Sequence, residues 1–356
     1  MHSTCEVRGA RGHMRARRWR FPLQPAQSQR SLMQSYFFVV FIAISASCGK
    51  LPTPPYAPST PEGVLPLAID ADPAWSHDGS IIAFHRRLPS SYGPAGLYVI
   101  AAAGGEPRFL APGDLTWPIK LSFSHDDSYL VCNFVDQLYQ VNVATGATRQ
   151  LFYTPSGAGD PACSPSTDVV LYRRTAYQFG DPLDSVGIHV FNLATGLDSA
   201  FRVNGQQIGG FDLAWSPSGD SFAEITSAPT LEYLVTLYSA DGTGSRVLVR
   251  TTTRNASIRD LRWYQATRSG TGGVRYFLQN GVPHGGVFFV SESGGANYRA
   301  LDQASGDIAF SPNGVSLVYE DWDPASGAIV LFVRQINDIS SASRRRLTHY
   351  SQPPGS

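Results

Sequence analysis

A short motif recurs six times along the chain and constrains its fold more than any other feature. Its fullest copy is Asp72–Gly79 (DPAWSHDG), and every copy has an aromatic or apolar anchor before a turn. The anchors are Trp75, Phe123, Cys163, Trp215, Trp263 and Phe310, which lie 48, 40, 52, 48 and 47 residues apart. A period of this size indicates a supersecondary unit that is stacked repeatedly. We number the six units repeat 1 to repeat 6.

Each repeat contains four short β-rich runs separated by tight-turn residues. In repeat 1 the turn is followed by Ile81 to His85, Leu97 to Ile100 and Pro107 to Leu110. Runs such as Leu97 to Ile100 are apolar on both faces, whereas a sheet with one wet face would alternate. Radial stacking of sheets accounts for this pattern, and no long stretch after residue 50 has helical periodicity. The sequence predicts an all-β fold, a six-bladed β-propeller with four antiparallel strands per blade.

The repeats resemble the TolB-type, WD40-like (PD40) propeller repeat. The match is close over Trp75 to Gly79, Ile81 to Phe84 and Gly96 to Leu110, and good over Trp215 to Gly219 and Phe310 to Gly314. Repeats 3 and 5 lack the Pro-Asp-Gly and are recognised by position. The resemblance covers about residues 64 to 350 and is specific for fold rather than for function.

The N-terminal region is typical of an export signal. Basic residues, among them Arg15, Arg17, Arg18 and Arg20, precede the apolar run Tyr36 to Ala46, which is too short to span a bilayer. Small residues then lead to Cys48, as in bacterial lipoprotein signals, although Ser45 stands where leucine is usual. We expect lipidation at Cys48; an ordinary cleaved signal with an incidental cysteine is the alternative. The start codon is open between Met1, Met14 and Met33.

These features predict four segments. Residues 1–47 form the targeting segment, 48–63 a Pro-rich tether, 64–350 the propeller and 351–356 a tail. By family analogy, Gly49 after the cysteine directs a lipoprotein to the periplasmic side of the outer membrane, and a soluble periplasmic or secreted protein is the alternative. Val64 to Ile69 and Arg345 to His349 compete for the outer strand position of the last blade, and the sequence leaves this open.

Composition and motifs argue against several classes of function. The chain has 28 basic and 28 acidic residues, so it has no bulk attraction to nucleic acid or to anionic membranes. It has no nucleophile elbow, P-loop, dinucleotide fingerprint or zinc motif. His77 and His125 occupy a turn position where proline is usual, which favours a surface turn over a ligand role. Cys132 and Cys163 are expected to be buried thiols, and a disulfide between them is the alternative.

An acidic residue stands three positions before the anchor in five of the six repeats. These residues are Asp72, Asp160, Asp212, Asp260 and Asp307, with Lys120 in repeat 2. The fold would arrange them around one mouth of a central channel, where carboxylates could bind a divalent cation or a basic peptide. Alternatively, each aspartate accepts backbone N–H bonds and joins neighbouring blades; the regular recurrence favours this structural role.

The connections between second and third strands vary most, and binding residues concentrate on such loops. Their arginine and aromatic content suits a protein-binding face, although the aromatic residues could instead cover blade edges. The candidate residues are Arg86, Arg87, Tyr92, Arg173, Arg174, Tyr177, Phe179, His284 and Trp322.

The sequence therefore predicts a non-catalytic, monomeric, TolB-like scaffold without a cofactor. By the resemblance, its partners are envelope proteins or peptides, and it meets the membrane only through a lipid anchor. TolB carries an additional N-terminal domain where this chain has a linker, which argues against a role in the Tol system itself. The alternative is a propeller hydrolase or lyase that uses the channel-mouth carboxylates with a divalent cation. A degenerate paralogue without a strong ligand is a third possibility.

Overall fold

The computed structural model describes the chain in twelve ranges. They are residues 68–88, 93–113, 120–154, 157–175, 186–227, 232–250, 256–264, 273–280, 286–291, 298–301, 307–336 and 343–350. Between 256 and 301 the side chains described are those of Leu261, Arg262 and Trp263. The chain divides into two compact units, Met1–Pro52 and Thr53–Ser356, and the described residues belong to the second. None of the described residues forms a helix of the length and hydropathy needed to cross a membrane. Cys48 lies outside the described ranges.

The described secondary structure consists of β-strands, which follow the repeats. Repeat 1 contains β1 (Ile69–Trp75), β2 (Ile81–Arg87), β3 (Gly96–Ala101) and β4 (Arg108–Pro112), and repeat 2 contains β5 (Leu121–Phe123), β6 (Tyr129–Phe134), β7 (Gln137–Asn142) and β8 (Thr148–Gln150). Repeat 3 contains β9 (Ala158–Cys163), β10 (Val169–Arg174), β11 (Gly187–Asn192) and β12 (Asp198–Ala200), followed by a hairpin of β13 (Arg202–Val203) and β14 (Gln206–Gln207). Repeat 4 contains β15 (Phe211–Trp215), β16 (Ser221–Ser227), β17 (Tyr233–Ser239) and β18 (Ser245–Arg250). Repeat 5 contains β19 (Ala256–Tyr264), β20 (Gly273–Asn280), β21 (Gly286–Ser291) and β22 (Tyr298–Leu301), and repeat 6 contains β23 (Ile308–Phe310), β24 (Ser316–Asp323), β25 (Ala328–Gln335) and β26 (Arg345–Arg346).

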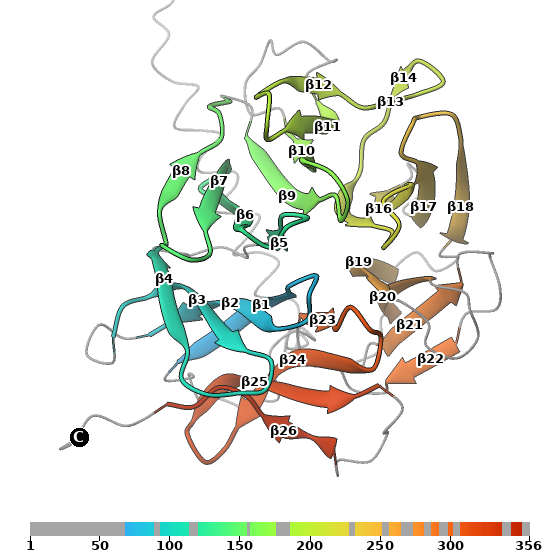
Figure 1. Ribbon diagram of the computed structural model, residues 1–356. Coiled ribbons are helices and arrows are strands. Elements are labelled where there is room, and N and C mark those ends of the chain that lie inside the picture. Colours follow the sequence, from blue (N-terminus) through green and yellow to red (C-terminus); the bar gives the residue numbers. More distant parts are fainter. Residues whose placement is uncertain are drawn as a thin grey trace, which may run out of the picture. The chain divides into compact units, whose positions relative to one another are not determined.

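The four strands of each repeat pair antiparallel in chain order. Repeats 2 to 5 form separate four-stranded sheets, and repeats 1 and 6 are joined into one eight-stranded sheet by a parallel contact of Ile69 with Ile329. Figure 1 shows the first strands β1, β5, β9, β19 and β23 toward the centre and the fourth strands toward the outside. This all-β architecture of antiparallel four-stranded sheets fits a β-propeller.

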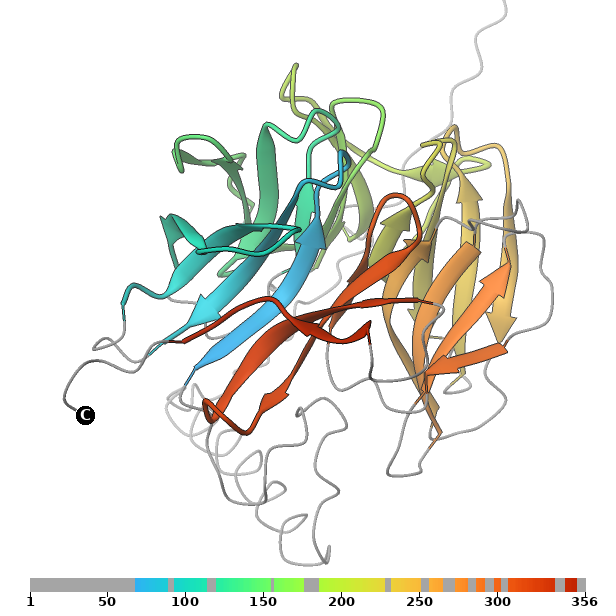
Figure 2. The same cartoon turned by 60° about the horizontal axis from the view of Figure 1, so that its bottom comes forward.

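The junction of repeats 1 and 6 bears on the two competing outer strands. β26 pairs with β25 through Phe332 and Val333, so Arg345–Arg346 takes the outer position in repeat 6. The amide of Ile329 donates to the carbonyl of Ala68 on the same edge of β25, because β24 occupies the opposite edge, and Figure 2 shows β1 beside β25. Residues 64–67 lie outside the described ranges.

The core lies between successive sheets, as the apolar strands require. β3 is buried along Gly96–Ile100, so both of its faces are covered. On one side Leu97 and Val99 pack with Leu130 and Val141 of repeat 2. On the other side Ile82, Phe84 and Tyr98 pack with side chains of repeat 6 such as Val318 and Leu331. The sheet of repeat 1 is thus stabilised by the removal of apolar area on both faces from water.

Candidate functional site

Three of the five recurrent aspartates share one unusual backbone conformation. Asp72, Asp160 and Asp212 have φ angles of 54°, 54° and 59°. Each lies within its first strand, at a shift in the pairing register with the second strand. Aspartate adopts left-handed backbone more readily than most residues because its short polar side chain bonds locally. The recurrence of aspartate is therefore explained in these three repeats by a β-bulge.

Asp212 is the aspartate with the fullest set of described partners. Its carboxylate accepts hydrogen bonds from the Lys120 ammonium at 2.8 Å and from the Leu261 amide at 2.8 Å, and Arg262 lies at 3.5 Å. Burial favours the neutral acid, but Lys120 and Arg262 outweigh it and lower the pKa of Asp212. Lys120 also donates to the Leu213 carbonyl at 2.6 Å. The lysine that replaces aspartate in repeat 2 thus supplies a counter-ion to the aspartate of repeat 4, and Asp212 also joins repeat 5.

The remaining acidic positions have different surroundings. Asp160 forms an ion pair with Arg173 at 3.0 Å, and the amide of Asp307 donates to the Glu320 carboxylate at 3.0 Å. Asp72 is buried, and the side chain of Asp260 lies outside the described set. Within the described ranges, no group of three or more His, Cys, Asp and Glu residues could hold a metal ion.

The predicted loop-face residues divide between buried and exposed positions. Arg86 is buried, donates two hydrogen bonds to Asp70 at 2.7 and 2.8 Å, and lies over the rings of Phe84, Tyr98 and Tyr350. Arg87 beside it is exposed. Arg173 and Arg174 are half-buried in β10. Tyr92, Tyr177, Phe179 and His284 lie outside the described ranges.

Trp322, predicted to lie on a connection between a second and a third strand, lies within a strand instead. Glu320–Asp323 belong to β24, and Trp322 pairs with Ile329 in β25. Trp322 is 9% exposed, so it packs into the sheet end. Trp322 and Asp323 are both buried, so the last residues of β24 belong to the folded sheet rather than to an exposed loop.

Two exposed residues that were not predicted from the sequence lie at the ends of the sheets where second strands lead to third strands. We call these ends of the sheets the rim. Val135, in the turn between β6 and β7, is 74% exposed, and Tyr153, after β8, is 76% exposed. The side-chain amide of Gln137 links the two segments by donating to the Thr154 carbonyl at 2.8 Å and accepting from the Thr154 amide at 3.0 Å. Val135 could have been identified from the sequence, because it stands in a two-residue hairpin turn, a position that asparagine, aspartate or glycine usually occupies.

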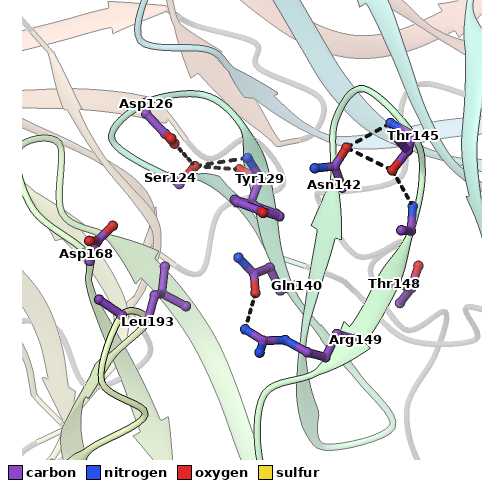
Figure 3. A pocket seen from close by; sticks show the side chains of 12 residues that line it. Ser124, Asp126, Tyr129, Gln140, Asn142, Thr145, Thr148, Arg149, Asp168 and Leu193 are labelled. Atoms are coloured by element: carbon purple, nitrogen blue, oxygen red, sulfur yellow. Dashed lines mark hydrogen bonds between the residues drawn. The ribbon is translucent and has the colours of Figure 1, made fainter.

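A polar pocket lies between repeats 2 and 3, at the opposite sheet ends from Val135. Its volume is about 450 Å³, and its walls come from the β5–β6 and β7–β8 turns of repeat 2 and the equivalent turns of repeat 3 (Figure 3). The lining residues are Ser124, Asp126, Tyr129, Gln140, Asn142, Thr145, Ala147, Thr148, Arg149, Asp168, Leu193 and Ala194.

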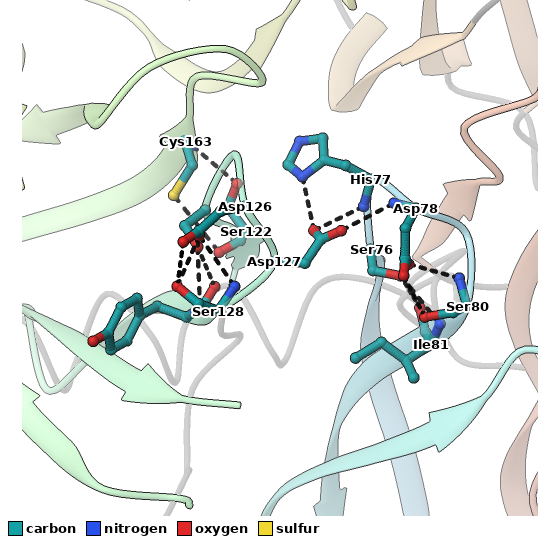
Figure 4. Close-up of polar contacts among 12 residues, drawn as sticks. Ser76, His77, Asp78, Ser80, Ile81, Ser122, Asp126, Asp127, Ser128 and Cys163 are labelled. Atoms are coloured by element: carbon teal, nitrogen blue, oxygen red, sulfur yellow. Dashed lines mark hydrogen bonds and ion pairs between the residues drawn. The ribbon is translucent and has the colours of Figure 1, made fainter. Parts of the chain in front are cut away.

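Neighbouring turns at this end of the sheets are linked to one another. Asp127 of repeat 2 accepts from the amides of His77 and Asp78 at 2.8 and 2.9 Å, and the His77 ring lies 2.9 Å from the same carboxylate (Figure 4). His125 approaches Asp168 of repeat 3 at 3.4 Å. Both histidines therefore lie in turns and contact the next repeat.

Cys132 and Cys163 are buried free thiols, as expected. The Cys163 amide donates to the Ser122 hydroxyl at 2.9 Å, which joins repeat 3 to repeat 2 (Figure 4). Burial raises the pKa of Cys132 and Cys163 to about 12, so neither is a reactive thiolate at neutral pH.

The comparisons with known proteins agree with this architecture. TolB from Acinetobacter baumannii superimposes with a TM-score of 0.52 at 14% identity, covering 88% of this chain and 69% of that one. A putative TolB from Agrobacterium tumefaciens gives 0.50 at 15% identity, covering 68% and 84%. An oligogalacturonate lyase from Vibrio parahaemolyticus gives 0.49 at 14% identity, covering 82% and 83%. No protein-family model and no curated protein sequence matches the chain. The resemblance of the chain to TolB-type propellers is thus confirmed at the level of the fold.

Proposed function

We propose that the chain is an exported, non-catalytic, six-bladed β-propeller that binds a protein partner through the rim carrying Val135 and Tyr153. The six-bladed arrangement is supported by contacts between successive first strands. β1 contacts β5, β5 contacts β9, β9 contacts β15, β15 contacts β19, β19 contacts β23, and β23 contacts β1. Such a cycle is what six sheets around one axis require.

The observation that carries the binding proposal is the conformation of Val135. Its φ angle is 45°, and a β-branched residue pays about 1–3 kcal/mol for such a backbone. The side chain gains little burial in return, because it projects from the turn into solvent. Strain that presents an apolar side chain to solvent is expected where the side chain meets a partner. Tyr153 adds a second apolar group, of a type enriched in protein interfaces.

The rim also carries an exposed arginine. Arg87 is exposed at the end of β2, whereas Arg173 and Arg174 at the end of β10 are half-buried and form ion pairs with Asp160 and Asp198. We therefore expect the partner to be an envelope protein or peptide segment with an apolar anchor and an acidic group that meets Arg87. We propose that Asp72, Asp160 and Asp307 lie around the channel mouth near this rim and take part in the same binding site.

The proposal predicts site-specific crosslinking at this rim. Photoreactive p-benzoylphenylalanine in place of Tyr153 should yield a protein adduct in native envelopes, to be identified by mass spectrometry. Leu197 is the matched control, because it is 70% exposed in the β11–β12 turn at the opposite sheet ends. Adducts of equal yield at both positions, or none at Tyr153, would contradict the binding proposal.

Export and lipidation are tested separately. Replacing Cys48 with alanine is expected to move the protein from the membrane to the soluble fraction and to abolish palmitate labelling. Cys5→Ala is the control, because Cys5 precedes the proposed cleavage point and should leave both readouts unchanged. An unlabelled wild-type protein, or labelling that survives Cys48→Ala, would rule out the anchor.

A further inference from the structure

An arginine contact recurs between neighbouring repeats. Arg108 in β4 donates to the carbonyls of Val143 and Ala144 in repeat 2, at 2.6 and 3.4 Å. Arg345 in repeat 6 donates in the same way to the carbonyls of Ala102 and Ala103 in repeat 1, at 2.9 and 3.1 Å. In both cases the guanidinium extends from one sheet to the turn between the third and fourth strands of the next sheet. We call this contact the arginine bridge.

The structurally equivalent arginine of repeat 2 is Arg149, and it does not make this bridge. Arg108 pairs with Val99 across the third and fourth strands, Arg345 pairs with Val333, and Arg149 pairs with Gln140. Where repeats 1 and 6 have valine, repeat 2 has a glutamine whose Oε1 accepts from the Arg149 guanidinium at 2.7 Å. Gln140 therefore retains Arg149 on its own sheet.

The consequence is the pocket between repeats 2 and 3. The turn that Arg108 reaches is Asn142–Gly146 (NVATG), and the corresponding turn of repeat 3 is Asn192–Gly196 (NLATG). Its Leu193 and Ala194 are the residues an arginine bridge would reach, and both line the pocket. The space that a guanidinium occupies between repeats 1 and 2 and between repeats 6 and 1 thus forms part of a cavity of about 450 Å³.

The groups that face the cavity favour a particular ligand chemistry. Because Oε1 of Gln140 is bound by Arg149, its amide nitrogen is directed toward Tyr129 (Figure 3). Among the described residues neither this nitrogen nor the Tyr129 hydroxyl has a hydrogen-bond partner. Opposite them the Asp168 carboxylate is 48% exposed and can accept hydrogen bonds. Tyr129, Leu193 and Ala194 provide apolar surface beside these polar groups.

The charges of the lining residues restrict the class of ligand that the pocket can bind. Asp126 and Asp168 carry two negative charges against the single positive charge of Arg149, which disfavours an anionic ligand. The Gln140 amide nitrogen is a donor and does not suit a cation. A neutral ligand that has hydrogen-bond donors, hydrogen-bond acceptors and an apolar face fits all of these lining groups. We propose that this pocket binds a neutral sugar ring, on the opposite side of the sheets from the protein-binding rim.

The decisive variant is Gln140→Val, which restores the residue found at Val99 and Val333. It should release Arg149 to bridge to repeat 3, close the pocket and keep or raise the melting temperature. The probes are cellobiose, lactose and N,N′-diacetylchitobiose, with digalacturonate as the anionic comparison. Saturation-transfer NMR and calorimetry on the wild-type protein should detect at least one neutral disaccharide. Binding to that disaccharide should weaken by about tenfold or more in Gln140→Val.

A second pair of variants separates pocket closure from a general change in the fold. Asp168→Asn alters a lining group and should weaken binding, whereas Asp241→Asn, in the distant β17–β18 turn, should not. Absence of binding to all three neutral disaccharides, tighter binding of digalacturonate, or unchanged binding by Gln140→Val would each overturn the proposal. The crosslinking result at Tyr153 is independent of all these outcomes.

Discussion

Replacing Asp70 with asparagine is expected to lower the free energy of unfolding by about 3–5 kcal/mol. The Asp70 carboxylate is completely buried and accepts both hydrogen bonds from Arg86, whose guanidinium lies within 5.2 Å of the ring centres of Phe84, Tyr98 and Tyr350. Removing the carboxylate charge leaves a buried cation without its counter-ion. Urea denaturation at neutral pH measures the change.

The matched control is an exposed ion pair of similar length. Glu232 and Arg250 are 2.8 Å apart, but their side chains are 30% and 55% exposed. Glu232→Gln should therefore cost less than about 1 kcal/mol. The double variant Asp70→Leu with Arg86→Met should recover most of the lost stability, because it leaves no unpaired charge. If Asp70→Asn cost no more than Glu232→Gln, the assigned structural role of Arg86 would be incorrect.

Replacing Glu224 with glutamine is expected to change the free energy of unfolding differently at different pH. Its effect at alkaline pH should be more stabilising than its effect at pH 4 by about 3 kcal/mol. Glu224 is fully buried, and its burial raises the pKa of the carboxyl to about 7 despite a hydrogen bond from Tyr238 at 2.7 Å. Its second oxygen has no described partner and faces Gly210, where a Cβ would lie 2.3 Å from that oxygen.

The direction of the pH effect follows from the two pKa values. The unfolded carboxyl, with a pKa of 4.5, loses its proton before the folded one, with a pKa of about 7. Wild-type stability therefore falls as pH rises between these values, whereas Glu224→Gln lacks this loss. His85, whose pKa burial lowers to about 4, reduces stability toward acid pH in both proteins and cancels in the comparison.

The two proteins should be compared by denaturation at a series of pH values from 4 to 8. Asp241→Asn serves as the control, since Asp241 is exposed and its pKa is lowered by hydrogen bonds from Thr243. Its profile should run parallel to that of the wild type in this range. A parallel profile for Glu224→Gln would show that the carboxyl titrates normally in the folded state.

The candidate site was predictable where a residue repeats and unpredictable where it differs. The aspartates at positions 72, 160 and 212 were visible from their spacing, because one bulge geometry selects the same residue each time. Lys120 was visible only as an exception to this pattern. Its partner Asp212 lies 92 residues away in a repeat that is not its neighbour, and periodicity does not specify such a contact.

The sequence by itself determined the repeated four-stranded unit and its burial on both faces, because apolar runs of that length and spacing can be covered only by similar sheets. Only the tertiary structure decided which polar side chains of equivalent positions meet. That choice depends on distances between repeats and on single residues such as Gln140, which retains Arg149 where valine in another repeat leaves the arginine free to cross. Hydrogen bonds of this kind depend on the relative positions of two sheets. The sequence periodicity within each sheet does not specify those positions.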